Sequence, residues 1–299
     1  MKLCFGDFLI EKNKNMKKIL SFAINNYPGS GSDLQGCVND QNNIINILGK
    51  EFGFETTWFK DSQVTRNLFR DEVSKLVLSA VNGDIIVIHV SSHGTQLPDV
   101  NLDEGDGYDE ALYLHDGPFS DDEFSSILFH LKEGVICIFI MDCCFSGTIT
   151  RDINKKAKFK PLFSEVDGEG YPVEIKFRRS REISSGMNHL VITGCSNLQT
   201  SADALINGSY NGALTYAAMK ELVPGITYRE WHKRTLKWLS SHKYTQTPQL
   251  EGPEWMFDLG VFGSTVVKQK KCWLLKLFGK KDSPIKIDKP DNPPKPPIG

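Results

Sequence analysis

Two short motifs, each directly after a strand-like apolar run, constrain this chain more than any other feature. The first, Ser-Ser-His-Gly around His93, follows residues 85–90, and the second, Asp-Cys-Cys-Phe-Ser-Gly around Cys144, follows residues 135–141. Runs this apolar are typical of strands buried on both faces, and so of a parallel sheet covered by helices. Because chemistry in open α/β sheets lies beyond the carboxyl ends of the strands, we expect the imidazole and the thiol to meet at one sheet edge. That pairing is what a cysteine nucleophile and its base require.

The second motif holds two cysteines, and the residues alone leave both as candidates for the nucleophile. Side chains alternate along an extended strand, so only one of Cys143 and Cys144 can face the cleft, and Asp142 then faces the same way as Cys144. Backbone N–H groups of Ser146–Gly147, or of Gly94, are available for an oxyanion. We favour Gly94 because a glycine lets the backbone approach the reacting carbonyl. Taken singly, a loop histidine and a core cysteine would need no function, but their joint placement after sheet strands indicates one.

The bulk composition is that of a globular protein. The chain has 299 residues, of which 40% are hydrophobic and 24% charged, with a net charge of −2. No apolar run approaches the roughly 20 residues of a membrane-spanning helix, and we expect no signal peptide. The seven cysteines are odd in number and include no Cys-x-x-Cys pair. This argues against a disulfide framework or a zinc site, and for a reducing, cytoplasmic location.

The pattern along the chain alternates between strands and helices, which predicts an α/β fold. We expect a central, mostly parallel sheet of six to eight strands flanked by helices and joined by right-handed crossovers. Expected strands are 18–24, 55–59, 84–90, 111–114, 135–141, 189–193 and 255–262. Expected helices are 38–51, 62–80, 120–131, 213–222 and 228–241, with Ser120 and Glu123 forming a capping box.

Three segments fall outside this alternation. Residues 1–16 are read as an N-terminal extension, residues 148–187 as an exposed basic connector, and residues 268–299 as a basic Pro-rich tail. The body at 17–267 thus divides into 17–147 and 188–267 around the connector. A short basic amphipathic stretch in the tail suggests weak contact with an anionic membrane surface, although such stretches more often pack on their own domain. The acidic body argues against nucleic-acid binding.

A series of segments in consistent order across residues 17–262 resembles the metacaspase-type members of the caspase-like clan of cysteine peptidases, family C14, type I-like without a long prodomain. The separation of His93 and Cys144 is also close to the roughly 50 residues typical of caspases. The matching segments are 23–29, 33–40, 92–96, 106–110, 121–123, 142–147, 194–196, 199–203, 211–213 and 246–250.

This resemblance implies a caspase-like α/β sandwich, with Cys144 as nucleophile and His93 as its base and acid. It further implies cleavage of protein or peptide substrates after Arg or Lys, by a monomer. A buried cation needs carboxylates around it, which agrees with an acidic pocket. From the residue alone, a role as a helix N-cap is the favoured interpretation of Asp40. The pocket residues implied by the family are Asp40, Asp142, Cys37 and Ser91.

An acidic block between Thr95 and Leu131 holds ten Asp or Glu and no Lys or Arg. The resemblance implies that calcium, a cofactor of several metacaspases, binds carboxylates of this region, since hard cations take oxygen ligands. The alternative is a solvated acidic loop that also serves a helix N-terminus. The implied ligands are Asp109, Asp121, Asp122 and, in an alignment displaced by about a residue, Asp152.

An enzyme that cuts after basic residues can also cut its own basic connector. Candidate positions are Arg179 and Arg181, or a residue of the group Lys155, Lys156 and Lys158. The alternative is that the connector is only a soluble loop. Self-processing is therefore an expectation that intact mass can test.

The chain departs from the usual family pattern at Ser92, where glycine is common, and at Phe145, where histidine is common. These departures leave the chemistry in place and concern fine substrate preference. Rival interpretations are a catalytically silent caspase-like scaffold or binding module, a hydrolase of another class such as a thioesterase, and a calcium-responsive regulator. Retention of His93, Cys144 and both pocket carboxylates argues against the first two.

Overall fold

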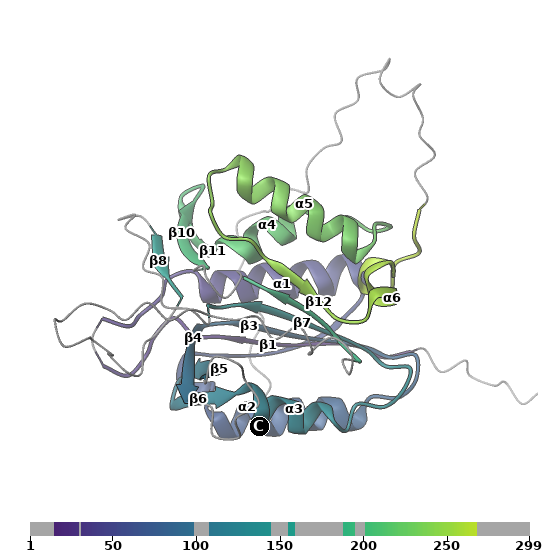
Figure 1. Ribbon diagram of the computed structural model, residues 1–299, viewed down its shortest axis with the longest axis horizontal. Coiled ribbons are helices and arrows are strands. Elements are labelled where there is room, and N and C mark those ends of the chain that lie inside the picture. Colours follow the sequence, from purple (N-terminus) through teal and green to yellow (C-terminus); the bar gives the residue numbers. More distant parts are fainter. Residues whose placement is uncertain are drawn as a thin grey trace, which may run out of the picture.

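A computed structural model describes residues 15–29, 31–98, 108–144, 155–158, 188–194 and 201–267. Its centre is a six-stranded sheet in the order β12-β9-β7-β3-β1-β2, in which every pairing is parallel except that of β12 with β9 (Figure 1). This confirms the predicted mostly parallel α/β architecture. The strands are β1 (Lys17–Ala23), β2 (Glu55–Lys60), β3 (Ile85–Ser91), β7 (Ile136–Asp142), β9 (Leu190–Thr193) and β12 (Gln249–Glu251).

Helices cover both faces of the sheet (Figure 1). On one side lie α1 (Cys37–Phe52), α4 (Ala213–Glu221) and α5 (Tyr228–Ser241), and on the other lie α2 (Arg66–Ser79) and α3 (Asp121–Leu128). Each side has its own apolar core, and strand β3 supplies residues to both, which is why all seven of its residues are buried. The Thr65 and Ser120 side chains cap α2 and α3, and Ser120 forms the predicted capping box with Glu123.

Two small antiparallel sheets lie beyond the central strands (Figure 1). The first joins β4 (His93–Pro98), β5 (Tyr108–Leu114) and β6 (Gly117–Ser120), and the second joins β8 (Lys155–Ala157), β10 (Ala202–Ile206) and β11 (Ser209–Gly212). Because β4 follows β3 after one residue, the first small sheet starts at the carboxyl edge of the central sheet. These sheets supply much of the site described below.

The strand predicted at 255–262 is wrong. The chain instead forms a short helix, α6 (Glu254–Phe257), and a 3-10 turn, η3 (Val261–Gly263). Another 3-10 turn, η1 (Asp61–Gln63), lies elsewhere, between β2 and α2. Pro253 precedes α6 with a fixed φ of −62°, and Phe262 has a positive φ of 51°, which no strand residue adopts. The sixth strand is the short β12, ahead of this segment.

The predicted exposed connector, 148–187, is also corrected in part. Residues 155–158 are described, and they form β8 followed by Lys158, whose side chain is fully buried. The remainder of the connector, the extension as far as residue 14 and the tail at 268–299 lie outside the described residues. Among the described residues, no helix combines the length and apolar character needed to cross a membrane.

Candidate active site

His93 and Cys144 lie at the same edge of the central sheet. Strands β3 and β7 are adjacent and parallel, and their last residues, Ser91 and Asp142, are paired in register. His93 and Cys144 each follow two residues after those ends, and both are buried. The two apolar strands, which are buried on both faces, therefore bring a thiol and an imidazole to one place, as the sequence predicts.

The thiol of Cys144 is turned toward the loop before β10. The backbone N–H of Ser201 donates to Sγ of Cys144, and Sγ lies 3.4 Å from the Ser201 carbonyl oxygen. Cys143 packs instead into the apolar core on the α2 and α3 side. Alternation along the strand thus separates the two cysteines, with Cys144 at the site.

His93 is held by the loop between β1 and α1. Its Nε2 lies 2.6 Å from the carbonyl oxygen of Ser32, so Nε2 carries a proton and Nδ1 is the basic nitrogen of the neutral ring. The backbone N–H of His93 donates to the Tyr27 hydroxyl at 2.9 Å, and that hydroxyl donates to the Tyr113 carbonyl at 3.0 Å. The Tyr27 and His93 rings also contact each other, with centroids 4.9 Å apart. Tyr27 and Ser32 were not among the predicted site residues.

Two backbone N–H groups converge on one carbonyl oxygen beside the thiol. The N–H of Gly94 lies 2.9 Å, and the N–H of Cys144 lies 3.2 Å, from the carbonyl oxygen of Lys158. Paired N–H donors of this kind form an oxyanion hole. The sequence pointed to Gly94 but not to the N–H of Cys144, and the alternative pair Ser146–Gly147 lies outside the described residues.

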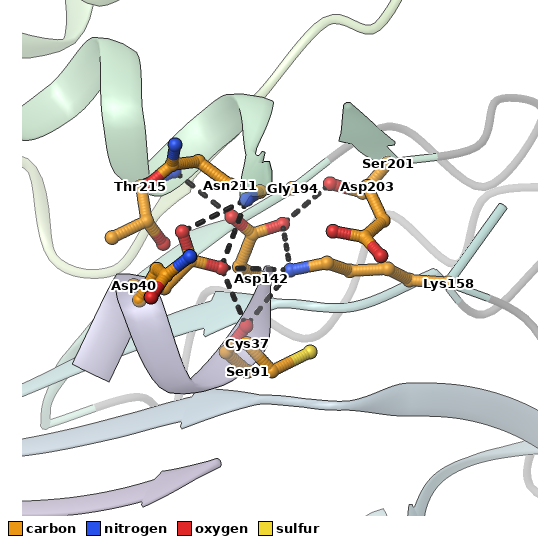
Figure 2. A network of polar contacts seen from close by, with 12 residues as sticks. Cys37, Asp40, Ser91, Asp142, Lys158, Gly194, Ser201, Asp203, Asn211 and Thr215 are labelled. Atoms are coloured by element: carbon orange, nitrogen blue, oxygen red, sulfur yellow. Dashed lines mark hydrogen bonds and ion pairs between the residues drawn. The ribbon is translucent and has the colours of Figure 1, made fainter. Parts of the chain in front are cut away.

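The side chain of Lys158 fills a buried acidic pocket next to this carbonyl (Figure 2). Its Nζ lies 3.0 Å from Oδ2 of Asp40, 3.3 Å from Oδ1 of Asp142 and 2.8 Å from Oγ of Ser91. Ser91 also donates to Oδ2 of Asp40 at 2.8 Å. The name acidic pocket is used below for the space bounded by Asp40, Ser91 and Asp142. The N-cap alternative for Asp40 is wrong, because the N-cap of α1 is Gly36.

Backbone groups of the later part of the chain complete the pocket wall. The N–H of Gly212 donates to both oxygens of Asp40, at 2.8 and 3.0 Å, and the N–H of Thr215 donates to Oδ2 of Asp142 at 2.9 Å. The Ser201 hydroxyl donates to Oδ1 of Asp142 at 2.6 Å. A Cβ atom at Gly212 would overlap both carboxylates and the Lys158 ammonium. The only sequence signal for this wall was the position of Ser201 and Gly212 in family-like segments.

Burial and charge set the protonation of the pocket. Burial, together with the negative charge of Asp142, raises the pKa of Asp40 to about 7 against the opposing charge of Lys158. Burial also raises the pKa of Asp142, but Lys158 and the hydrogen bonds from Ser201 and Thr215 outweigh it and hold that pKa below its usual value. Burial alone would lower the pKa of Lys158, yet the carboxylates raise it well above normal. Burial raises the pKa of Cys37 to about 12, so this pocket residue stays a neutral thiol.

The residues that build this site all lie in a region of the chain that matches one known protein family. A family model described as the caspase domain, of peptidase family C14, matches residues 16–254. The chain belongs to the caspase family C14. Within this caspase domain, the match covers every described residue of the site and both cores, except Met256, Val261 and Phe262 of the second core.

The sequence relatives of this caspase domain are metacaspases. Metacaspase-1 of Saccharomyces cerevisiae strain S288c is 29% identical over 289 residues, covering 78% of this chain and 66% of that protein. Metacaspase-1B of Aspergillus fumigatus is 30% identical over 279 residues, covering 75% of this chain and 67% of that protein. The chain therefore spans about two thirds of the length of the curated relatives it matches. It is a metacaspase-type member of the family.

Solved structures show the same fold. A crystal structure of a Geobacter sulfurreducens protein aligns with a TM-score of 0.64 at 24% identity, covering 84% of this chain and 99% of that one. Caspase-1 from Spodoptera frugiperda aligns with a TM-score of 0.52 at 16% identity, covering 84% of this chain and 91% of that one. These likenesses confirm the predicted caspase-like sandwich.

The carboxylates predicted to bind calcium do not form a cation site in the part of this caspase domain that the structure describes. Asp109 lies on β5 and is buried, whereas Asp121 and Asp122 begin α3, where the Asp122 N–H donates to Asp121. No group of three or more His, Cys, Asp or Glu side chains in the described ranges is arranged to hold a metal. The fourth predicted ligand, Asp152, lies outside those ranges. Calcium binding by these carboxylates stays a prediction.

Some of the positions predicted for self-cleavage lie outside the described residues, and others lie within them. Arg179 and Arg181 lie outside the described residues. Of the lysine group, residues 155–157 form β8, and Lys158 occupies the acidic pocket. The prediction for the two arginines stays a prediction.

Proposed function

We propose that this protein is a cysteine endopeptidase that cleaves protein or peptide substrates after Lys or Arg. The observation that carries this proposal is the placement of one lysine residue. The Lys158 ammonium is buried between Asp40 and Asp142, while its own carbonyl oxygen receives the N–H groups of Gly94 and Cys144. When a basic side chain occupies the acidic pocket, the backbone carbonyl of the same residue therefore lies at the nucleophilic residue, Cys144.

The charge of the pocket supports basic specificity. Two fully buried carboxylates need a cation, because an unpaired charge out of water is costly. An arginine brings five N–H donors in a planar fork that pairs well with carboxylates, and a lysine brings three. An aspartate at this position would meet like charges, so the pocket excludes the residue after which caspases proper are expected to cut.

The proposed mechanism uses the thiol, the imidazole and the two backbone N–H donors. His93 takes the thiol proton at Nδ1, and Sγ of Cys144 attacks the carbonyl carbon of the basic residue. The developing oxyanion is stabilised by the N–H groups of Gly94 and Cys144. His93 then gives its proton to the leaving amine, and water hydrolyses the acyl-enzyme to release a carboxylate. The Ser32 carbonyl stabilises the imidazolium that forms between these steps.

The test is hydrolysis of matched fluorogenic peptides that end in Lys, Arg or Asp, followed over hours. We expect cleavage after Lys and Arg, none after Asp, and none by Cys144→Ala, with circular dichroism showing that both proteins are folded. Parallel samples with millimolar calcium or with a chelator test the predicted calcium activation separately. Hydrolysis that survives Cys144→Ala, or that favours Asp, would contradict the proposal.

A further inference from the structure

A groove of about 510 Å³ lies on the α2 and α3 side of the central sheet, and the proposed mechanism makes no use of it. Its floor is the ring of Phe139 on β7. This ring contacts that of Phe124 on α3, with centroids 4.9 Å apart, and that of His189, with centroids 5.2 Å apart. Val191 on β9 and Phe129 at the end of α3 extend the apolar lining. A hollow of this size with such a lining is typical of a binding site.

The groove leaves apolar surface open on an interior strand of the sheet. Strand β9 lies between β7 and β12, and its Leu190 and Ile192 are buried in the core on the α4 and α5 side. Val191, between them, lines the groove and is only partly buried. Phe129 is 87% exposed, more than any other large apolar side chain among the described residues. An exposed apolar patch of this kind marks an interaction site.

We propose that residues 3–10 of the N-terminal extension occupy this groove and hold the extension against the domain. This inference is independent of the proposed peptidase activity. Residues 3–10 read Leu-Cys-Phe-Gly-Asp-Phe-Leu-Ile, so five of the eight carry large apolar side chains. Charge is also complementary, because residues 1–14 hold three Lys and two acidic residues. The described residues that line the groove include the carboxylates of Glu110, Asp121 and Glu251, and none of them is Lys or Arg.

The chain enters β1 from the side of the sheet on which the groove lies. Met16, the residue before β1, packs against the core on the α2 and α3 side, and its N–H donates to Oδ1 of Asp84 at 2.7 Å. The N–H of the preceding residue, Gly83, donates to the carbonyl oxygen of Gly134 at 2.9 Å, in the short link between α3 and β7. The extension therefore leaves the domain at the end of the sheet at which α3 finishes.

The distance from this exit to the groove is short enough for the extension. In the register of the sheet, Leu20 lies level with Ile88 of β3, which lies level with Phe139 of β7. Phe139 is thus four residues along and two strands across from Met16, or about 16 Å at roughly 3.3 Å per residue and 4.8 Å per strand. The six residues from Met16 back to residue 10 span about 20 Å when extended. Tethering then gives the segment an effective concentration of roughly millimolar.

The basic tail is the other terminal segment with apolar residues, but it starts on the opposite side of the sheet. The N–H of Val267 donates to the carbonyl oxygen of Gly225 at 2.9 Å, in the link between α4 and α5. The tail must therefore pass around the sheet to reach the groove. The extension needs only to continue along the side that Met16 already contacts.

Hydrogen–deuterium exchange of the full chain, read by mass spectrometry of peptic fragments, tests this inference. Cys144→Ala is present throughout, so that no proteolysis by the protein itself can change the chain. We expect the amides of residues 3–10 to exchange about tenfold more slowly, or slower still, than those of a free synthetic peptide of residues 1–14. Exchange at the rate of the free peptide would overturn the inference.

Variants with matched surface changes locate the contact. Phe129→Ser removes a side chain that the domain itself leaves exposed, so we expect the domain to stay folded and most of the protection of residues 3–10 to disappear. Phe8→Asp, within the extension, should have the same effect. Leu78→Ser, a change at an exposed apolar residue of α2 outside the groove, should leave protection unchanged. Thermal unfolding checks that each variant is folded, and equal protection in Phe129→Ser and Leu78→Ser would remove the groove as the site.

The same exchange data separate the extension from other occupants of the groove. Protection of residues 270–281 that is lost in Phe129→Ser, with residues 3–10 unprotected, would assign the groove to the tail. Protection of residues 3–10 that falls on a hundredfold dilution of the protein would assign the contact to a second copy of the chain. Either result overturns docking of the extension within its own chain.

Discussion

Asp40 and Asp142, which are 102 residues apart in the chain, bind the same ammonium nitrogen, at 3.0 and 3.3 Å. Asp40 lies in the first turn of α1, the helix drawn above the sheet in Figure 1, and Asp142 is the last residue of the central strand β7. When both carboxylates are ionised, they carry two negative charges against one cation, and the hydrogen bonds of Gly212, Thr215 and Ser201 stabilise the excess. The pocket therefore favours a bound cation, and burying its carboxylates without one costs free energy.

Replacement of either carboxylate by its amide should weaken the pocket without changing its shape. Breaking one partner of a buried ion pair costs about 3–5 kcal/mol, which corresponds to a loss of about 100-fold or more in kcat/KM. We expect Asp40→Asn and Asp142→Asn to show this loss with Lys and Arg reporters, while Asp71→Asn, an exposed control, shows none. Equal losses with a neutral reporter would mean that the substitutions damage catalysis in general rather than recognition of charge.

Gly212→Ala should close the pocket by filling it. The φ of Gly212 is −67°, which alanine adopts without strain, so the expected effect comes from the added methyl group and not from the backbone. Because that methyl group overlaps both carboxylates, we expect Lys and Arg hydrolysis to fall below about a tenth of the wild-type rate. Gly49→Ala, inside α1 and with ordinary contact distances, is the matched control. It should keep full activity and gain about 0.5–1 kcal/mol of stability. Wild-type kinetics from Gly212→Ala would contradict the geometry of the pocket wall.

Tyr27→Phe should lower kcat more than it raises KM. The lost hydroxyl leaves the His93 N–H and the Tyr113 carbonyl without this partner, so His93 is less firmly placed while the acidic pocket is untouched. We expect roughly a tenfold lower kcat and a loss of about 1–3 kcal/mol in unfolding free energy. Tyr216→Phe removes a hydroxyl that accepts a hydrogen bond from Asn207, remote from His93. That control should lose stability but not kcat, and a matching loss of kcat there would remove the case for Tyr27 as a positioning residue.

The parts of this site that follow strand ends could be predicted from the sequence. Buried parallel strands leave an unmistakable apolar run, and their carboxyl ends must meet, so the order of residues alone places His93, Gly94 and Cys144 together. Helix limits were also accessible, because caps such as Ser120 act over three or four residues. Capping contacts of this kind join residues that are close in the sequence, so the sequence predicts them.

The contacts of Lys158 could not be predicted in the same way. Lysines are almost never fully buried unless they are paired, and its partner Asp40 lies 118 residues away. Polarity alone therefore indicates an exposed loop. The wall formed by Gly212 and Thr215 acts through backbone N–H groups, which every residue but proline carries, so side-chain type gives no signal of it.

Stability should depend on pH through Asp40. Its pKa is about 3.9 in an unfolded chain and about 7 in the folded protein, mainly because of burial. Between these values the folded state holds a proton that the unfolded state does not, so the contribution of Asp40 is fully present below about pH 4 and is lost as the pH rises through about 7. The pKa of Asp142 is lowered and that of Lys158 is raised, so neither changes charge within this window.

Urea unfolding of Cys144→Ala, with and without Asp40→Asn, measures this contribution between about pH 4.5 and 7.5 without self-cleavage. We expect the protein with Asp40 to lose stability relative to the Asn variant as pH rises, with a slope on the order of 1 kcal/mol per pH unit. Burial lowers the pKa of His89 to about 3, which gives a slope of its own, but His89 is present in both proteins and cancels in the difference. Parallel curves would show that Asp40 is ionised throughout this range, and that the buried pocket holds both negative charges at all times.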